Sequence, residues 1–440
     1  MPRPLAVVVL AAGLGTRTKV PFPKVLLPLC GRTLLRTVLD TTAELEPERT
    51  VVVVHHGKDQ VVASVAGLDV TCVDQGEPMG TGHAAQVAME VLAGFEGDLL
   101  LLYGDGALIT AETLRRLRDA RGDQAVALLT AHPLDPTGLG RILRDEQGDF
   151  VAIREERDCS DTERVIDEVN SGFYCFDAGR LPAALAALTR RNAQAEYYLT
   201  DTVGWFAERG DGVVAVATED PDEVQAVNSL DELALARSIL QERILLQHLH
   251  NGVIIEDPAT TYIEGGVAIG RGTRVLPCTV IHAGCRIGEG CEVGPFSHLR
   301  PGAILEDGAE VGNFVEVKKS VIGKHSKAKH LTYLGDTTIG ERANIGAGTI
   351  TANYDGKHKH PTVIGDRAFL GSGTVVVAPA KIGDDAITGA GAVLTRDTEV
   401  GEGEVYIGVP ARPLNRAAPL KGTGPLKGAG PLKGTGKEQR

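Results

Sequence analysis

Aliphatic residues recur at every sixth position along much of the second half of this 440-residue chain. The unbroken series comprises Ile263, Ile269, Val275, Ile281, Ile287, Val293, Leu299, Leu305, Val311 and Val317. After an interruption the period returns at Ile339, Ile345, Ile364, Leu370, Val376 and Ile382. A period of six matches neither an α-helix nor an isolated strand. It predicts a parallel β-helix, in which each hexapeptide forms one side of a coil and its aliphatic residue stacks on the equivalent residue about 4.8 Å along the axis.

The first half of the chain, from 5 to about 228, follows a different pattern. Short runs rich in valine and leucine occur as LAVVVL, TVVVVHH, DLLLLYGD and AVALLT, with amphipathic stretches such as TLLRTVLDTTAELE and AETLRRLRDA between them. Strands that alternate with helices predict βαβ units and a largely parallel sheet buried on both faces. Leucines and isoleucines at helical spacing from 229 to 250 predict one further helix that joins two domains.

Composition and charge indicate which kinds of binding partner the chain can have. The formal net charge is -13, which argues against the basic face that nucleic-acid binding requires. The seven cysteines form no close CxxC pair, which favours reduced thiols over a disulfide framework or a zinc site. The first apolar run is short for a secretory signal, and no run approaches the roughly 18 residues that span a bilayer. We therefore expect a cytoplasmic protein that binds neither a membrane nor a nucleic acid.

The stretch LAAGLGTRTKVPFPK, residues 10–24, follows the first predicted strand. Gly13 and Gly15 would let backbone N–H groups approach a polyphosphate closely. Arg17 and Lys24 would neutralise the charge that builds up as a phosphoryl bond breaks. Glycine-rich turns are common after strands, so a nucleotide site and an ordinary turn both remain open from these residues alone.

The motif G-x-G-T-R followed by P-K resembles the signature of the sugar-1-phosphate nucleotidylyltransferases. The resemblance continues in QGEPMGTGHA (75–84), YGDG (103–106), GLGRI (138–142), EVNSGFY (168–174) and AVNS (226–229). With the hexapeptide series included, the chain resembles the bacterial bifunctional N-acetylglucosamine-1-phosphate uridyltransferase/glucosamine-1-phosphate acetyltransferase family. This resemblance extends from about residue 5 to 412.

The resemblance implies a fold class and domain boundaries. It implies an α/β, Rossmann-like nucleotidyltransferase domain over 1–228 and a helical linker over 229–250. A left-handed parallel β-helix with acetyltransferase activity would follow over 251–415. The remaining segment, 416–440, repeats PLKG with abundant glycine and proline, which predicts a disordered basic tail.

The resemblance also implies roles for residues of the first domain. The residues expected along the nucleotide are Leu10, Ala11, Ala12 and Gly13, with Arg17 and Lys24 as catalytic cations. Those expected to contact uracil are Gln75, Gly80 and Thr81, and those expected to hold the sugar are Gly140, Glu155 and Asn170. Asp105 and Asn228 would hold Mg²⁺. The chain departs from the family in having Gly106 and Ala107 after the metal aspartate, which suggests a looser metal loop.

The hexapeptide series is interrupted by VEVKKSVIGKHSKAKHLTYLGD (315–336), which concentrates lysines and histidines in an acidic chain. A charge run of this kind is usually a solvated loop, but here it stands out as a candidate anion site. HLRPGA, HLTYLGD and NIGAGTITANYDG resemble the acetyltransferase half of the same family.

By that resemblance, His330 is the general base that takes a proton from an amine, a task suited to an imidazole at neutral pH. The residues implied for the phosphate and sugar are Arg300, Lys318, Lys359, Tyr333 and Asn344. Those implied for the acetyl-CoA co-substrate are Asn353, Tyr354, Ser372 and Ala390. The family commonly has an arginine near position 408 that contacts CoA, and this chain has Gly408.

The resemblance implies an enzyme that makes UDP-N-acetylglucosamine from glucosamine-1-phosphate, acetyl-CoA and UTP, through N-acetylglucosamine-1-phosphate. It also implies a homotrimer, by analogy with related β-helix acyltransferases. Two alternatives stay open: a nucleotidylyltransferase with a purely regulatory β-helix, and a non-enzymatic subunit of the same two-domain plan. The motifs HLTYLGD and NYDG oppose the first alternative, and retention of Arg17, Lys24, Asp105 and Asn228 opposes the second.

Overall fold

The computed structural model of the chain describes residues 3–414, so the predicted disordered tail over 416–440 lies outside the described residues. The chain divides into two compact units. The first extends to residue 247 and includes 263–265, and the second comprises 248–262 and the chain from 266 onward.

The first unit is built on a sheet with the strand order β11-β7-β10-β6-β1-β4-β5. In chain order these strands are β1 (Leu5–Leu10), β4 (Arg49–Val54), β5 (Thr71–Asp74), β6 (Asp98–Tyr103), β7 (Val126–Ala131), β10 (Val169–Asp177) and β11 (Val213–Ala217). Only β10 on this path is antiparallel, to both of its neighbours. The hairpin of β8 (Arg141–Arg144) and β9 (Phe150–Arg154) extends from β10, and β2 (Pro28–Leu29) pairs with β3 (Arg32–Thr33). The predicted, largely parallel sheet is confirmed.

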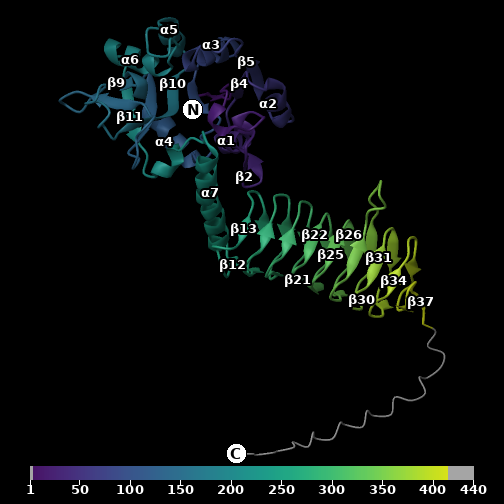
Figure 1. The fold of residues 1–440 in the computed structure, drawn as a ribbon. Helices are drawn as coiled ribbons and strands as arrows, with labels where there is room; N and C mark the ends of the chain where they lie inside the picture. The colour runs from purple at the N-terminus through teal and green to yellow at the C-terminus, as the bar shows by residue number, and fades with distance from the viewer. Residues whose placement is uncertain (1–2, 415–440) are drawn as a thin grey trace, which may run out of the picture. The chain divides into compact units, whose positions relative to one another are not determined.

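Helices cover both faces of this sheet, and Figure 1 shows α3, α5 and α6 on one side with α1, α4 and α7 on the other. The helices are α1 (Leu34–Ala43), α2 (Lys58–Ser64), α3 (Thr81–Val91), α4 (Ala111–Arg121), α5 (Leu181–Ala186), α6 (Thr200–Arg209) and α7 (Leu230–His250). The short 3-10 helices are η1 (Thr16–Thr18), η2 (Lys24–Leu26), η3 (Glu156–Asp158) and η4 (Pro221–Val224). Val7 and Val9 of β1 pack in one core, and Val8 packs in the other. Successive strand residues point to opposite faces, so two covered faces require the continuous apolar runs seen in the sequence.

Helix α7 packs on the first unit over much of its length. Its N-terminus has a capping arrangement, in which the Glu232 carboxylate accepts hydrogen bonds from the N–H groups of Asn228 and Ser229. Leu233 and Ala236 are buried in the core below the sheet. Further along, the Arg243 guanidinium donates to the carbonyl of Leu108 at 2.6 Å. The helix is therefore part of the first unit's core as well as a connection.

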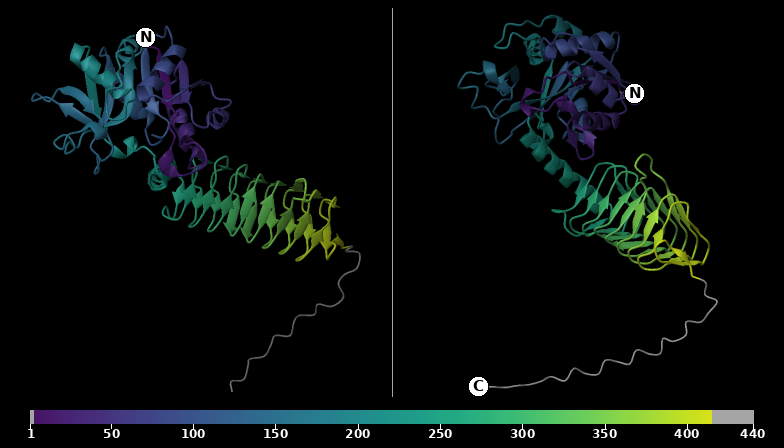
Figure 2. Two further views of the ribbon diagram at one scale, coloured as in Figure 1. Left: turned by 45° about the horizontal axis from the view of Figure 1, so that its top comes forward. Right: turned by 45° about the vertical axis from the view of Figure 1, so that its right-hand side comes forward.

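The second unit is a stack of coils, shown in two views in Figure 2. Apart from the final antiparallel pair β36 and β37, neighbouring strands within each of its three sheets are three apart in chain order, so each coil adds one strand to each sheet. The first sheet contains β12 (Ile254–Ile255), β15 (Arg274–Val275), β18 (Glu292–Val293), β21 (Glu310–Asn313), β24 (Lys327–His330), β27 (Asn344–Ile345), β30 (Phe369–Leu370), β33 (Ile387–Thr388), β36 (Val405–Ile407) and β37 (Arg412–Pro413). The second contains β13 (Tyr262–Ile263), β16 (Val280–Ile281), β19 (His298–Leu299), β22 (Glu316–Lys318), β25 (Tyr333–Gly335), β28 (Ile350–Ala352), β31 (Val375–Val377) and β34 (Val393–Leu394). The third contains β14 (Ala268–Ile269), β17 (Arg286–Ile287), β20 (Ile304–Leu305), β23 (Val321–Ile322), β26 (Thr337–Ile339), β29 (Thr362–Ile364), β32 (Ala380–Ile382) and β35 (Glu399–Val400).

The hexapeptide period determines which side chains pack inside these coils. Val275 pairs with Val293, Val293 pairs with Val311, and all three side chains are buried. Each coil thus places its aliphatic residues on those of the coil before it, and the predicted parallel β-helix is confirmed. Cys285 and Cys291 are also buried, in keeping with small packing residues.

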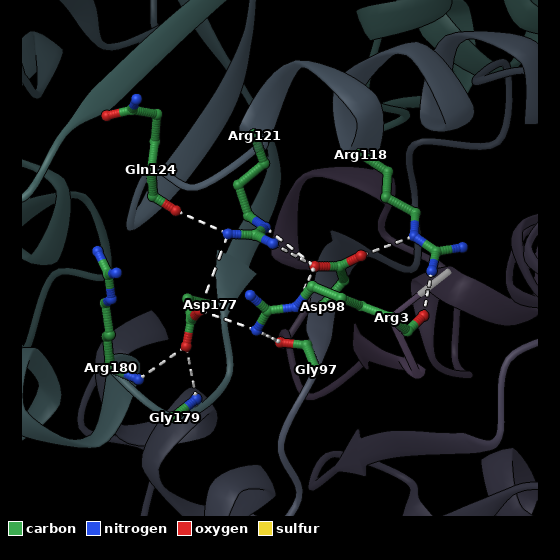
Figure 3. A network of polar contacts seen from close by, with 9 residues as sticks. All are labelled: Arg3, Gly97, Asp98, Arg118, Arg121, Gln124, Asp177, Gly179 and Arg180. Carbon is green, nitrogen blue, oxygen red and sulfur yellow. Dashed lines mark hydrogen bonds and ion pairs between the residues drawn. The ribbon is translucent and has the colours of Figure 1, made fainter. Parts of the chain in front are cut away.

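A network of buried ion pairs lies at the edge of the first sheet where β6 begins (Figure 3). The Asp98 carboxylate accepts from Arg121 at 2.6 Å and 3.0 Å and from Arg118 at 2.8 Å. Asp177, paired with Asp98 across β10 and β6, accepts from Arg3 at 2.9 Å. Asp98 and Arg121 are 5% and 2% exposed. Each of these two buried charges therefore depends on the other to offset the cost of its removal from water.

Replacing Asp98 by asparagine should lower the free energy of unfolding by about 3–5 kcal/mol, because the buried Arg121 guanidinium loses its close charge partner and keeps only the longer ion pair to Asp177 at 3.8 Å. Urea unfolding followed by the fluorescence of Trp205, the chain's single tryptophan, measures this in the first unit. Glu219→Gln is the control, since Glu219 forms an exposed pair with Arg116 and should change stability by no more than about 0.5 kcal/mol. Equal effects of the two substitutions would contradict a stabilising role for the buried network.

A fragment of residues 1–250 should unfold at a higher urea concentration than a fragment of residues 1–228. The shorter fragment lacks α7 and so exposes the core surface that Leu233 and Ala236 cover. The same tryptophan signal compares the two midpoints. Identical midpoints would show that α7 adds nothing to the stability of the first unit.

Candidate active sites

The first candidate site is a pocket of about 400 Å³ at the edge where β1, β5 and β6 end. The residues that line it are Leu10, Ala11, Ala12, Gly13, Leu14, Lys24, Val25, Gln75, Pro78, Gly80, Thr81, Ala84, Tyr103, Asp105 and Glu196. Ligands of parallel sheets bind at this edge, beyond the carboxyl ends of the strands. Every residue predicted to lie along the nucleotide or to contact uracil is in this lining.

The glycine-rich loop brings Lys24 to the pocket. Gly15 has a φ of 61°, and a Cβ placed on it would lie 2.8 Å from the Cβ of Lys24. A side chain at position 15 would be strained and would push Lys24 away. Arg17, by contrast, lies exposed on η1 and is not among the lining residues. The structure therefore brings one of the two predicted catalytic cations into the pocket.

Lys24, Asp105 and Asn228 meet although they are far apart in the chain. The Lys24 ammonium donates to Asp105 Oδ2 and, at 2.8 Å, to Asn228 Oδ1. The Lys24 and Asp105 side chains are 12% and 13% exposed. The ammonium therefore lies between the two residues predicted to hold a metal.

The side-chain oxygen atoms of Asp105 and Asn228 suit a hard divalent cation. Asp105 Oδ1 is buried and accepts no hydrogen bond from the part of the chain that the structure describes. Carboxylate and amide oxygens are the ligands that Mg²⁺ takes, usually together with water and substrate phosphates. Within residues 3–414 no cluster of three or more His, Cys, Asp or Glu side chains is placed to hold a metal. A metal at Asp105 and Asn228 would therefore need further ligands from the substrate.

The loop that carries Asp105 is packed, despite the glycine that follows. A Cβ at Gly106 would lie 2.5 Å from Cζ of Phe173, so the buried aromatic ring occupies the space of the missing side chain. Ala107 is buried as well. The Val227 N–H donates to the Asp105 carbonyl at 3.1 Å and ties this loop to the segment that carries Asn228. The looser loop expected from Gly106 and Ala107 is not what these contacts indicate.

The predicted uracil contacts form one wall of the pocket. The Gln75 amide Nε2 donates to the Gly80 carbonyl at 3.0 Å. Gly80 has a φ of 108°, and a Cβ there would lie 2.6 Å from the Tyr197 carbonyl oxygen. The Thr81 hydroxyl accepts from the N–H of Leu199 at 3.1 Å. This wall is thus held in shape by contacts to the segment before α6.

The three residues predicted to hold the sugar lie outside the pocket lining. The Asn170 N–H donates to the Gly140 carbonyl at 2.8 Å, so these two residues are neighbours. Glu155, which follows β9, accepts from the Thr200 hydroxyl at 3.0 Å. Burial raises the pKa of Glu155, and the carboxylate of Asp201 raises it further.

The second candidate site lies on the β-helix, where three cations gather. Arg300 and Lys318 occupy equivalent places on adjacent coils, because β19 and β22 pair in register. The Arg300 guanidinium donates to Glu316 at 2.7 Å. The ammonium of Lys359 and the guanidinium of Arg300 hold the pKa of Lys318 below its ordinary value. A cation whose pKa is lowered by neighbouring cations favours an anion beside it.

His330 is the last residue of β24 and is exposed. Its Nδ1 lies 2.8 Å from the amide oxygen of Asn313, its partner across β21 and β24. An amide oxygen accepts, so this contact places the proton on Nδ1 and leaves Nε2 free to take one. Tyr333 and Asn344, the predicted sugar contacts, begin the strands β25 and β27 and are half-buried.

The residues predicted for acetyl-CoA fall on two features of the β-helix. Asn353 and Tyr354 lie at the start of the loop after β28, where the Asn353 amide donates to Asp336 at 2.5 Å. Ser372 and Ala390 are exposed corner residues of adjacent coils, and the Gly391 N–H donates to the Ser372 carbonyl at 2.8 Å.

Sequence reasoning missed residues at both sites. Tyr103 and Glu196 line the pocket, and Asn313 fixes the tautomer of His330. Tyr103 stood inside a recognised motif but had no assigned role. Asn313 could have been found from coil register, because it lies 17 positions before His330.

Within residues 3–414, no helix is long and apolar enough to cross a membrane.

Comparison with known proteins matches each unit to a family. Residues 7–165 match the MobA-like NTP transferase domain. Residues 284–319 and 361–396 match the bacterial transferase hexapeptide repeats. The two candidate sites thus belong to units that resemble two different kinds of transferase.

Curated relatives combine both units in one chain. The bifunctional protein GlmU of Pelotomaculum thermopropionicum is 43% identical over 81% of this chain and 86% of its own length. GlmU of Caldanaerobacter subterraneus is 41% identical over 86% of this chain and 90% of its own. GlmU of Thermobifida fusca is 42% identical over 86% of this chain and 87% of its own. The chain therefore belongs to the family of bifunctional GlmU enzymes, and it joins a uridyltransferase to an acetyltransferase.

Proposed function

We propose that the two reactions of this enzyme are divided between its two domains. Uridylyl transfer would belong to residues 1–228 with the helix over 229–250, and acetyl transfer to residues 251–415. The observation that supports this division is that the pocket with Lys24 and Asp105 and the β-helix site with His330 share no residue.

In the first domain, UTP would lie along the glycine-rich loop, with its base against Gln75, Gly80 and Thr81. Lys24 would supply positive charge to the phosphates, and Arg17 would join it from η1. Asp105 and Asn228 would hold Mg²⁺, which when bound supplies charge neutralisation between phosphate oxygens.

N-acetylglucosamine-1-phosphate would take the side of the site formed by Gly140, Glu155 and Asn170. Its phosphate oxygen would attack the α-phosphorus of UTP, and pyrophosphate would leave. Glu155 suits sugar binding, since its half-buried carboxyl already accepts a hydrogen bond from the Thr200 hydroxyl group and can accept others from sugar hydroxyls.

In the β-helix, the phosphate of glucosamine-1-phosphate would sit among Arg300, Lys318 and Lys359. Tyr333 and Asn344 would hold the sugar. Nε2 of His330 would take the proton of the amine as the new carbon–nitrogen bond forms and the thioester carbon–sulfur bond of acetyl-CoA breaks. The residues offered to acetyl-CoA are Asn353, Tyr354, Ser372 and Ala390.

The order of the two steps follows from their chemistry, because acetyl transfer makes the sugar phosphate that uridylyl transfer consumes. The product, UDP-N-acetylglucosamine, would feed peptidoglycan and lipopolysaccharide-type envelope synthesis in the cytoplasm.

We propose a homotrimer assembled through the β-helix. Phe296, Phe314 and Leu331 are exposed on one corner of successive coils, and the two phenylalanine rings stack at 5.2 Å. Exposed apolar side chains in a row favour burial against another protein surface. Leu331 follows His330 directly, so another copy on this corner would lie beside the proposed base.

Replacing His330 by alanine should slow acetyl transfer by about 10²- to 10⁴-fold, because the amine loses its proton acceptor. The Michaelis constant for glucosamine-1-phosphate should change little, since the cation cluster is untouched. Release of CoA thiol measures acetyl transfer, and release of pyrophosphate measures uridylyl transfer on the same preparation.

Asp105→Ala is the reciprocal variant and should lose uridylyl transfer while it keeps acetyl transfer. Near-normal CoA release by the His330 variant would remove His330 as the base. Loss of both activities in either variant, with the fold intact, would contradict the division by domain.

A further inference from the structure

The β-helix carries an inserted loop, residues 353–361, between β28 and β29. Figure 1 shows it as the yellow-green loop that projects from the stack of coils. Tyr354 and Lys359 form a bridge across the loop, and the His360 N–H donates to the Asn353 carbonyl at 2.8 Å. The loop is therefore a hairpin with two joined arms. One arm carries Asn353 and Tyr354, and the other carries Lys359.

Asp355 organises this hairpin through both carboxylate oxygens. Oδ1 accepts from the N–H groups of Lys357 at 2.8 Å and His358 at 2.7 Å. Oδ2 accepts from Nε2 of His360 at 2.7 Å and from the Arg396 guanidinium at 3.0 Å. The N–H groups of His358 and Lys357, with the His360 and Arg396 side chains, hold the pKa of Asp355 well below its ordinary range. One carboxylate thus fixes both the shape of the loop and its attachment.

Arg396 reaches the loop from another coil. It follows β34, which stacks on β31, which in turn stacks on β28 at the root of the loop. It is 41 positions from Asp355 in the chain. At the root, the Asn353 amide bonds to Asp336. The inserted loop is therefore held at its base by one coil and near its tip by another.

We infer that Asp355 and Arg396 are positioning residues for acetyl transfer, which hold the contacts for the two substrates in one fixed arrangement. The inference rests on the proposed roles of Asn353 and Tyr354 toward acetyl-CoA and of Lys359 toward the sugar phosphate. Because these contacts lie on joined arms of one loop, releasing the loop weakens both together. The turnover number changes less, since His330 and Asn313 lie outside the loop.

The test measures CoA release by the full chain while each substrate is varied in turn. Asp355→Ala should raise the Michaelis constants for acetyl-CoA and glucosamine-1-phosphate together by about tenfold, because it removes every hydrogen bond to the carboxylate. Arg396→Ala should raise both by about two- to fivefold, as expected for a partly exposed ion pair. Arg396→Lys should recover part of the loss. Uridylyl transfer should not change.

Arg367→Ala is the matched control. Arg367 forms a similar ion pair with Asp385 between adjacent coils, away from the inserted loop. It should leave both Michaelis constants as they are. Hydrogen exchange should show faster exchange in a peptide over 353–361 for the Asp355 and Arg396 variants only.

The outcomes separate this inference from the proposed function. If the unmodified chain releases no CoA, the proposed function fails. If it releases CoA and Asp355→Ala leaves either Michaelis constant within twofold of normal, the positioning role is overturned. The role is also overturned if Arg367→Ala has the same effect, or if exchange rises throughout the β-helix.

Discussion

Backbone pairing between successive coils determines which polar side chains meet on the β-helix. The inward aliphatic residues allow one register, because a slip of one residue would turn every buried side chain outward. That register places Asn313 beside His330 and Arg300 beside Lys318. The tautomer of the proposed base and the anion site are thus consequences of how Val275, Val293 and their equivalents stack. Within residues 3–414 the inserted loop is the one long departure from this register, and Ile339 pairs with Ile364 across it. Its own polar contacts replace the packing that the regular coils provide.

In the α/β unit, the sheet that is covered by helices on both faces determines which polar side chains meet. Burial on both faces fixes the strands, and the carboxyl ends of β1 and β6 bring the glycine-rich loop and Asp105 to one edge. The ion pairs of Asp98 and Asp177 hold the opposite edge. This arrangement separates stabilising charges from the charges available to a substrate. In the proposed reaction, phosphate and metal would replace the attraction between Lys24 and Asp105, and the ion pairs at the opposite edge would keep the fold intact.

The elements that were predicted from sequence are those that burial marks most strongly. The strands over 5–10 and 98–103 leave continuous apolar runs, and the hexapeptide coils and the helix at Leu230–His250 leave apolar residues at regular spacing. The reversed direction of β10 leaves none, because a strand covered on both faces reads alike in either direction. The packing of Phe173 on Gly106, the support of His330 by Asn313 and the ion pair of Asp355 with Arg396 depend on distances between chain segments. The separation of Arg17 from the pocket depends on the path of a short loop. The site residues were predicted from the family resemblance, whereas the side chains that contact them are seen only in the structure.

Phosphorus NMR on one mixture tests most directly whether both reactions belong to this chain. The full protein is supplied with glucosamine-1-phosphate, acetyl-CoA, UTP and Mg²⁺, and the sugar monophosphate signal is followed over time. We expect that signal to be replaced by the paired signals of a nucleotide sugar and by free pyrophosphate, with CoA thiol released in equal amount. Omitting acetyl-CoA should leave glucosamine-1-phosphate unconverted. If N-acetylglucosamine-1-phosphate is converted while glucosamine-1-phosphate with acetyl-CoA is not, the β-helix of this chain is not an acetyltransferase.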